Sequence, residues 1–130
     1  MSTPAPVPLI GIDLVEPPRL RDRLERHPDL RSELFTVREL AYCEAQPAEI
    51  EHLAARWCAK EAVVKALRLD GFDPLDIEIL AEGGAPELQL HGDALRRAQH
   101  LDVTVSVSLT HVPDMAAAVA LALPRALRLV

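Results

Sequence analysis

Two carboxylates occupy apolar positions in parts of the sequence that lie far apart. Asp13 lies within the apolar run IGIDLV (10–15), and Glu61 lies in a helical pattern that extends from Ile50 to Arg68. At 3.6 residues per turn, Glu61 falls one turn after Trp57, in the middle of the apolar face. Burying an unpaired carboxylate is costly, and one divalent cation bound by both residues would offset that cost. A few oxygen ligands completed by water and phosphate are typical of Mg²⁺, so we predict Asp13 and Glu61 as magnesium ligands.

Basic residues surround Glu61 on the same predicted helix: Arg56, Lys60, Lys65 and Arg68. Lysine and arginine beside a magnesium ion are typical of a pyrophosphate site, because both neutralise phosphate charge. The sequence contains no glycine-rich phosphate loop of either common kind, so binding would depend on side chains and metal. A simpler interpretation exists for each carboxylate, since Glu61 could pair with Lys65 one turn later and Asp13 could end a strand or cap a helix.

A cluster of arginines lies near the start of the chain. The segment RLRDRLERHPDLR (19–31) holds five arginines, although the formal net charge of the chain is −6. This net charge argues against a nucleic-acid-binding protein, which usually presents a basic surface. Arg19, Arg23 and Arg26 share one face of a predicted helix, and this face is either solvated or a docking patch for an acidic partner.

The first half of the chain is predicted to be mostly helical. An apolar run with β-branched residues predicts a buried strand at residues 8–15. Prolines and a capping-box pattern predict helices at 17–28, 37–45 and 47–69. We expect Gly71 to end the third and longest helix in the left-handed conformation.

The second half of the chain changes its hydrophobic period from 3.6 to 2. Strands are predicted at 76–81, 87–91, 103–110 and 115–123, with a short helix at 92–100. Gly83 and Gly84 indicate a hairpin between the first two of these strands. The predicted fold class is α+β, with an antiparallel sheet packed on a long central helix and the strand at 8–15 in the same sheet. The alanines of residues 116–122 would allow close approach of another backbone, which suggests assembly of several copies.

Length and composition set the remaining expectations. A chain of 130 residues favours one domain, here 8–130, after a proline-rich tail at 1–7. No run is long and apolar enough for a membrane span, and no basic residue precedes the first apolar run as in a secretory signal. Cys43 and Cys58 show no metal-binding spacing, so we expect reduced thiols and a cytoplasmic location.

Four segments resemble the motifs of the holo-acyl-carrier-protein synthases, the small bacterial class of 4′-phosphopantetheinyl transferases. They are GIDLVE (11–16), ARWCAKEAVVKAL (55–67), DIEI (76–79) and VSLTH (107–111). The resemblance implies transfer of the phosphopantetheine arm of coenzyme A to a serine of an acidic acyl or peptidyl carrier protein. It also implies dependence on Mg²⁺, release of adenosine 3′,5′-bisphosphate, and a homotrimer with active sites between subunits.

The resemblance also implies a role for each matching residue. Asp13 and Glu61 resemble the metal ligands, and Lys65 resembles the lysine near the transferred phosphate. Arg56, Lys60 and His111 resemble groups that contact coenzyme A phosphates. Arg19 matches an arginine that docks the carrier protein, which supports a docking role for the face that it shares with Arg23 and Arg26. The catalytic base is left open between Glu61 and a metal-bound water.

The sequence departs from the family pattern at two places. The connection RLDGFDPL (68–75) replaces a longer glycine-rich loop, and Val112 replaces an acidic residue that often follows the strand histidine. The alternative is therefore a degenerate member that binds a carrier protein or nucleotide without transfer. A purely structural trimer would require Asp13 and Glu61 to be exposed. The resemblance leaves open whether the carrier serves fatty-acid, polyketide or peptide synthesis.

Overall fold

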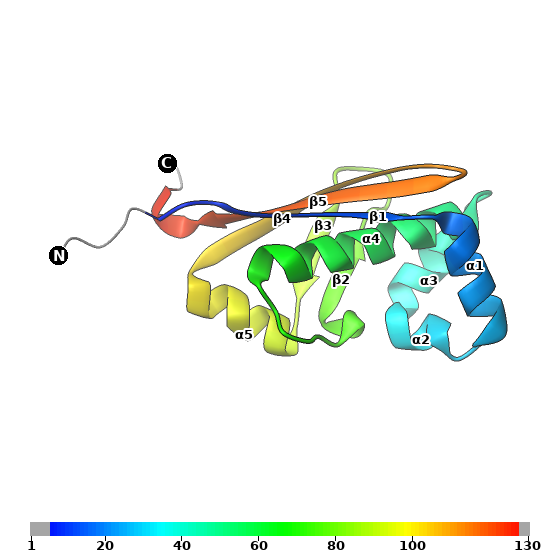
Figure 1. Ribbon diagram of the computed structural model, residues 1–130, viewed down its shortest axis with the longest axis horizontal. Helices are drawn as coiled ribbons and strands as arrows, with labels where there is room; N and C mark the ends of the chain where they lie inside the picture. The colour runs from blue at the N-terminus through cyan, green and yellow to red at the C-terminus, as the bar shows by residue number, and fades with distance from the viewer. Residues whose placement is uncertain (1–5, 128–130) are drawn as a thin grey trace.

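The computed structural model describes residues 6–127. Of the predicted tail at 1–7, the first five residues lie outside the described part of the chain. Figure 1 labels the main elements, which are β1 (Leu9–Val15), α1 (Pro17–Arg26), α2 (Leu30–Leu34), α3 (Val37–Glu44), α4 (Glu49–Leu67), β2 (Ile77–Leu80), β3 (Glu87–Leu90), α5 (Gly92–Leu101), β4 (Val103–Val112) and β5 (Met115–Pro124). No helix among the described residues is both long enough and apolar enough to cross a membrane.

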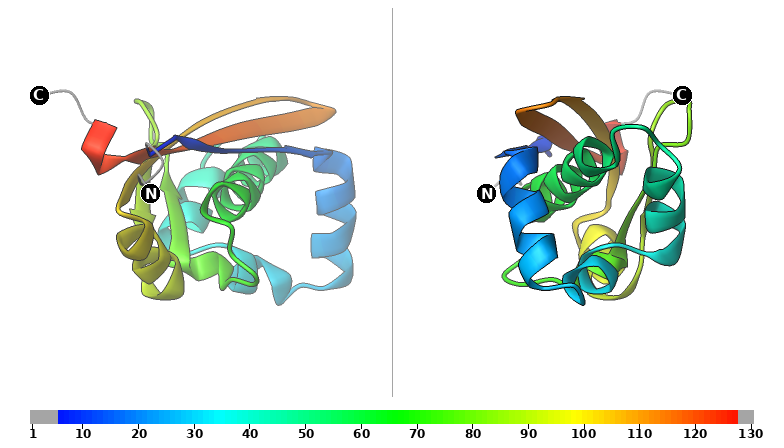
Figure 2. Two further views of the ribbon diagram at one scale, coloured as in Figure 1. Left: turned by 60° about the vertical axis from the view of Figure 1, so that its left-hand side comes forward. Right: turned by 90° about the vertical axis from the view of Figure 1, so that its right-hand side faces the viewer.

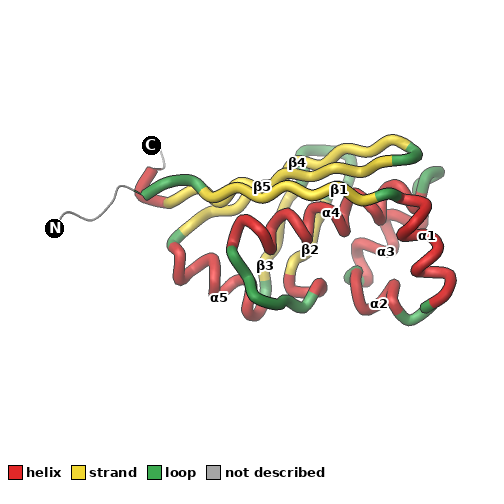
Figure 3. The backbone as a smooth tube through the Cα atoms, in the orientation of Figure 1, coloured by secondary structure: helices red, strands yellow, loops and turns green. Residues whose placement is uncertain are grey.

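The main sheet has three antiparallel strands in the order β1-β5-β4, and β2 pairs with β3 in a separate antiparallel hairpin. The tube view follows the long β4–β5 hairpin beside β1 (Figure 3). Helix α4 lies against one face of this sheet. Helices α1, α2 and α3 lie around the N-terminal half of α4 (Figure 2). The predicted α+β class, with an antiparallel sheet on a long central helix, is confirmed.

Small residues bring α4 unusually close to the sheet. The inward-facing residues of β5 are four fully or nearly buried alanines, at 116, 118, 120 and 122. Three of them share one core cluster with Ala59, Ala62 and Ala66 of α4. The helix of the same chain makes the close backbone approach that these alanines allow, so they do not themselves argue for assembly of several copies.

Gly11 provides the closest contact between β1 and α4. A Cβ atom at this position would lie 2.0 Å from the carbonyl oxygen of Ala62 and 2.8 Å from the backbone nitrogen of Ala66. Real Cβ atoms do not approach backbone this closely, so only glycine allows β1 to lie here. This contact places the side chain of Asp13, two residues later on the same face, over α4.

The predicted helix limits are partly confirmed. Thr36 and Glu39 form the expected capping box at the start of α3. The end of α4 differs, because Arg68 rather than Gly71 takes the left-handed conformation, with φ 57° and ψ 45°. No separate helix was predicted at α2, a five-residue helix between α1 and α3.

The outer face of the main sheet carries apolar side chains without a cover. Ile10, Ile12 and Leu14 of β1 are 62–65% exposed, and Leu121 of β5 is also exposed. The strand register places these side chains on the face opposite α4. Contiguous exposed apolar surface of this kind is uncommon on a protein that stays monomeric.

Candidate active site

The structure brings Asp13, Glu61 and Lys65 together where β1 crosses α4. The ammonium of Lys65 lies 3.1 Å from Asp13 Oδ1 and donates a hydrogen bond to the carbonyl oxygen of Ile12 at 2.9 Å. Glu61 lies one helical turn before Lys65, close enough to Asp13 for the two carboxylates to repel each other. A shared magnesium ion requires such proximity, and the ion itself stays a prediction.

Glu61 carries an electrostatic penalty in this arrangement. Partial burial and, second, the negative charge of Asp13 raise the pKa of Glu61, while Lys65 and Arg23 act in the opposite direction. Among the described residues, no hydrogen-bond donor or cation lies within ion-pair distance of its carboxylate. Glu61 is thus half-buried rather than central in the core, and its charge lacks a direct partner in the described part of the chain.

The backbone of β1 is held on α4 by side chains as well as by Gly11. The Cys58 thiol donates a hydrogen bond to the carbonyl oxygen of Asp13 at 2.9 Å. Burial, and then the charge of Asp13, raise the pKa of Cys58 to about 12, and burial raises the pKa of Cys43 to about 11. Both cysteines are free and buried, so the expectation of unreactive reduced thiols agrees with their surroundings.

The donor set fits a magnesium ion that shares its coordination with phosphate. Within residues 6–127, no group of three or more histidine, cysteine, aspartate or glutamate side chains could enclose a metal. Mg²⁺ is commonly bound by one or two carboxylates, with water and substrate phosphate completing an octahedron. Asp13 and Glu61 would supply those carboxylates, and a cation between them would relieve the repulsion that raises the pKa of Glu61.

Lys60 lies in the protein interior, although it is adjacent to Glu61 in sequence. Its side chain is 0% exposed, with the ammonium 2.7 Å from Glu39 Oε1 and 2.8 Å from the carbonyl oxygen of Pro74. Glu39 also accepts a hydrogen bond from the backbone N–H of Ile79 at 3.0 Å. In this conformation Lys60 ties α3 and β2 to α4 and is not available to a ligand phosphate.

Arg56 is also used internally. It is 1% exposed, donates to the carbonyl oxygen of Ala81 at 2.9 Å, and lies 4.9 Å from the centre of the Tyr42 ring. Contact of either Arg56 or Lys60 with coenzyme A phosphate stays a prediction that the geometry of a single chain does not favour. Arg68 is exposed and donates to the carbonyl oxygen of Lys65 at the end of the helix.

His111 does not join the Asp13–Glu61 cluster within one chain. The strand register pairs Asp13 with Ala118 and Ala118 with Leu109, so His111 lies two strands and two residues away. Strand spacing and rise put the two Cα atoms about 12 Å apart. Instead, His111 Nδ1 lies 3.0 Å from Glu51 Oε1 on the first turn of α4. Sequence reasoning missed Glu51, because nothing in its local pattern indicates a partner 60 residues away.

The three arginines of the predicted docking face are exposed on α1. Leu20 and Leu24 are buried on the opposite side of this helix, so the arginines face outward. Arg23 is near enough to Glu61 to lower its pKa, and it lines a surface hollow with Trp57. The exposed pair of Arg19 with Glu16 at 3.4 Å is weak and does not occupy Arg19 fully. The arginine face therefore borders the Asp13–Glu61 cluster.

Known proteins resemble this chain over most of its length. Residues 9–121 match the family described as the 4′-phosphopantetheinyl transferase superfamily. The holo-[acyl-carrier-protein] synthase of Moorella thermoacetica is 47% identical over 115 residues, which cover 85% of this chain and 90% of that protein. The corresponding protein of Mycolicibacterium paratuberculosis is 41% identical over 124 residues, with coverages of 86% and 93%.

A solved structure gives the same relationship in three dimensions. The ACPS–CoA complex of Chronobacterium ammoniagenes superimposes with a TM-score of 0.82 at 29% identity, covering 92% of this chain and 99% of that one. Sequence and structure thus agree over nearly the whole described chain. The chain belongs to the 4′-phosphopantetheinyl transferase superfamily, among its holo-[acyl-carrier-protein] synthases.

Proposed function

We propose that this protein transfers the 4′-phosphopantetheine group of coenzyme A to a serine of an apo carrier protein, with Mg²⁺, and releases adenosine 3′,5′-bisphosphate. The observation that carries the proposal is the convergence of Asp13, Glu61 and Lys65 at the crossing of β1 and α4. Membership of the family and likeness to a structure described as a complex with CoA support the same substrate.

The reaction forms one bond and breaks another at the same phosphorus atom. The serine oxygen of the carrier attacks the β-phosphorus of coenzyme A, and the bond from this phosphorus to the bridging oxygen breaks. The pantetheine arm and its phosphate stay on the serine, and the bridging oxygen leaves with adenosine 3′,5′-bisphosphate. Mg²⁺ held by Asp13 and Glu61 would supply positive charge that stabilises the pyrophosphate as negative charge develops.

The side chains of this chain have separate roles in that reaction. Lys65 neutralises charge on the transferred or the leaving phosphate, and its exposed ammonium is free to turn from Asp13 toward a bound phosphate. The serine loses its proton as the new bond forms. Glu61 and a metal-bound water are both candidates to accept this proton, because a Mg²⁺ ion held by Glu61 would offset the effect of Asp13 on its pKa.

We assign carrier docking to Arg19, Arg23 and Arg26 on the exposed face of α1. A protein with a net charge of −6 repels an acidic carrier unless it presents a local patch of opposite sign. The position of this patch beside the Asp13–Glu61 cluster would direct the carrier serine to the reacting phosphate.

We also propose that the protein works as a homotrimer in which the outer sheet faces meet. Other copies then cover the apolar face of Ile10, Ile12 and Leu14 with the same face of their own sheets. Within one chain His111 is remote from Asp13, which supports a site built from Asp13 of one subunit and His111 of another. The two free, buried thiols support a cytoplasmic location.

The proposal is tested by incubating the full chain with coenzyme A, Mg²⁺ and several apo carrier proteins and then weighing each carrier. We expect one carrier to gain the mass of phosphopantetheine, and we expect Asp13→Ala and Glu61→Ala to abolish the gain while the circular dichroism spectrum is kept. Glu87→Ala is the matched control, because Glu87 is an exposed carboxylate on β3, away from the site. Near-normal turnover in either site variant would exclude a shared metal site for that residue.

A degenerate member that binds without transfer remains the second candidate. Val112 is 57% exposed where an acidic residue is often found, and the loop at 68–75 has one glycine. Calorimetry and carrier mass together separate the two functions, because both proteins would bind coenzyme A but only the enzyme would change the mass of a carrier.

A further inference from the structure

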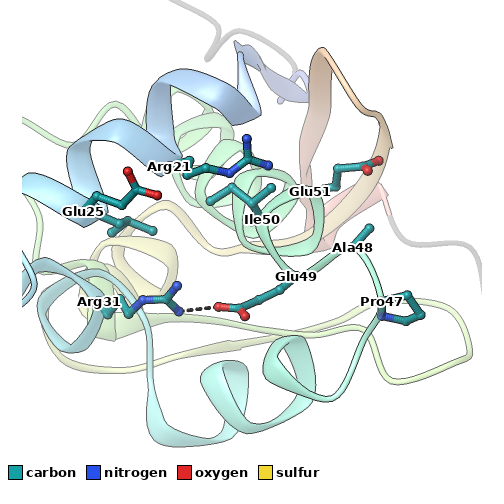
Figure 4. Close-up of a pocket in the computed structure, with 9 residues that line it drawn as sticks. Arg21, Glu25, Arg31, Pro47, Ala48, Glu49, Ile50 and Glu51 are labelled. Carbon is teal, nitrogen blue, oxygen red and sulfur yellow. Dashed lines mark hydrogen bonds and ion pairs between the residues drawn. The ribbon is translucent and has the colours of Figure 1, made fainter.

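Three side chains meet where the end of β4 contacts the start of α4: Glu51, His52 and His111. Glu51 Oε1 and His111 Nδ1 lie 3.0 Å apart, with side chains that are 18% and 28% exposed. Figure 4 shows Glu49 and Glu51 leaving the first turn of α4 in different directions, with Glu49 turned toward Arg31. Neighbouring carboxylates of one helix thus have different partners, and only Glu51 serves the histidine.

The contact with Glu51 determines which nitrogen of His111 carries a proton. An ionised carboxylate only accepts hydrogen bonds, so Nδ1 must be the donor. In the neutral ring Nε2 is then the unprotonated nitrogen, whereas a free imidazole is not restricted in this way. Glu51 therefore fixes both the tautomer and the orientation of the His111 ring, with Nε2 left free of this contact.

His52 restricts the same ring from a second direction. The two imidazoles pack edge to face, with centroids 4.7 Å apart and planes at 61°, and Tyr42 packs against His52 in turn at 6.1 Å. Burial first, and then the positive charges of His111 and Arg56, lower the pKa of His52, although Glu51 acts to raise it. The lowered pKa disfavours a cationic His52 as a partner of Glu51, and the 3.0 Å contact of this carboxylate is with His111.

We infer that Glu51 is a positioning residue, which binds Nδ1–H of His111 so that, in the protonated ring, Nε2–H donates to the phosphate of coenzyme A. The inference rests on the proposed function for the phosphate contact of His111. The link between Glu51 and the His111 ring is a property of the free protein and can be measured without any reaction. A positioning role also predicts that Glu51 acts only through His111.

The first experiment reads the tautomer by ¹⁵N-detected NMR of the histidine rings at a pH where they are neutral, with His111→Ala to assign the signals. We expect His111 to be Nδ1–H in the wild-type protein and to change mainly to Nε2–H in Glu51→Ala. Glu51→Gln keeps an acceptor oxygen and should retain part of the Nδ1–H form. Glu49→Ala is the matched control and should leave the tautomer unchanged. An unchanged tautomer in Glu51→Ala overturns the inference whatever the protein catalyses.

The second experiment is a double-mutant cycle on coenzyme A affinity, measured by calorimetry with Mg²⁺ present. We expect Glu51→Ala to weaken binding about tenfold in the wild-type background and to have no further effect in His111→Ala. Equal losses in both backgrounds would overturn the inference, because Glu51 would then act independently of the histidine. Unchanged binding in His111→Ala would overturn it as well, while carrier modification would still decide the proposed transfer reaction separately.

Discussion

Replacement of Gly11 by alanine tests how the position of Asp13 depends on the contact between β1 and α4. The added methyl group would lie 2.0 Å from the Ala62 carbonyl oxygen, whereas ordinary contacts begin at 3.4 Å. Both partners are backbone, so neither can rotate out of the way. The strand must therefore move about 1.4 Å from the helix at this point, or the helix must bend.

The expected loss follows from the size of that displacement. Overpacking of a tight core destabilises by about 1–3 kcal/mol, and a clash between two backbones belongs at the upper end. A loss of about 3 kcal/mol lowers the melting temperature of a chain of this size by roughly 10 °C. The same shift would open the 3.1 Å contact between Lys65 and Asp13, and a 1 Å misplacement of a reacting group can reduce turnover on the order of 100-fold.

Circular dichroism tests the expected loss of stability through thermal unfolding. Mass spectrometry of the carrier tests the expected loss of turnover separately. Gly84→Ala is the matched control, because nothing lies within 4 Å of its added Cβ, and we expect nearly unchanged stability and turnover. Gly11→Ala with wild-type melting temperature and activity would refute the idea that this close approach positions Asp13.

Four further predictions follow from the same structure. Glu61→Gln should raise the melting temperature at pH 7 without Mg²⁺, because a carboxyl whose pKa is raised by folding destabilises the protein as pH rises above 4.5. The gain should vanish near pH 4, and a gain that persists at that pH would contradict this cause. Arg19→Glu should raise KM for the carrier about fivefold and flatten the dependence of that KM on salt, with little change in KM for coenzyme A. Equal effects in the carrier and coenzyme A titrations would indicate that the arginine face is only solvated. Ile12→Arg should convert the proposed trimer to a monomer at micromolar concentration, as measured by sedimentation equilibrium. A wild-type protein that is itself monomeric would refute the proposed assembly. Arg68→Gly should stabilise the fold by about 1 kcal/mol in denaturant unfolding, because glycine tolerates φ 57°, and a loss of stability would show that its side-chain contacts outweigh the strain.

The sequence predicted those parts of the fold that depend on local pattern. Alternation of apolar residues located β4, prolines located α1, and the capping box of Thr36 and Glu39 located the start of α3. The two carboxylates could be predicted as partners because each is costly alone, and in the structure Asp13 is near enough to raise the pKa of Glu61. A favourable local signal was available in every one of these cases.

The predictions that failed concern the directions in which side chains leave α4 and the contacts between residues far apart in sequence. Lys60 and Glu61 are adjacent in sequence, yet one faces Glu39 in the core and the other faces Asp13, because α4 is covered on nearly all sides. A helix covered on several sides has no single apolar face from which the direction of each side chain could be deduced. The contact between Glu51 and His111 likewise depends on tertiary packing, which no local pattern reports.

The alanine contact between α4 and β5 also has a consequence for protein engineering. Because backbone approach rather than bulky side chains sets the distance between helix and sheet, the spacing of Asp13 and Glu61 depends little on residues elsewhere in the molecule. Leu20 and Leu24 pack α1 on α4 from the side opposite the arginines, and of the three arginines only Arg23 affects the pKa of Glu61. We therefore expect carrier preference to be exchangeable by grafting new residues at Arg19 and Arg26, with Arg23 and the chemistry at the crossing of β1 and α4 kept.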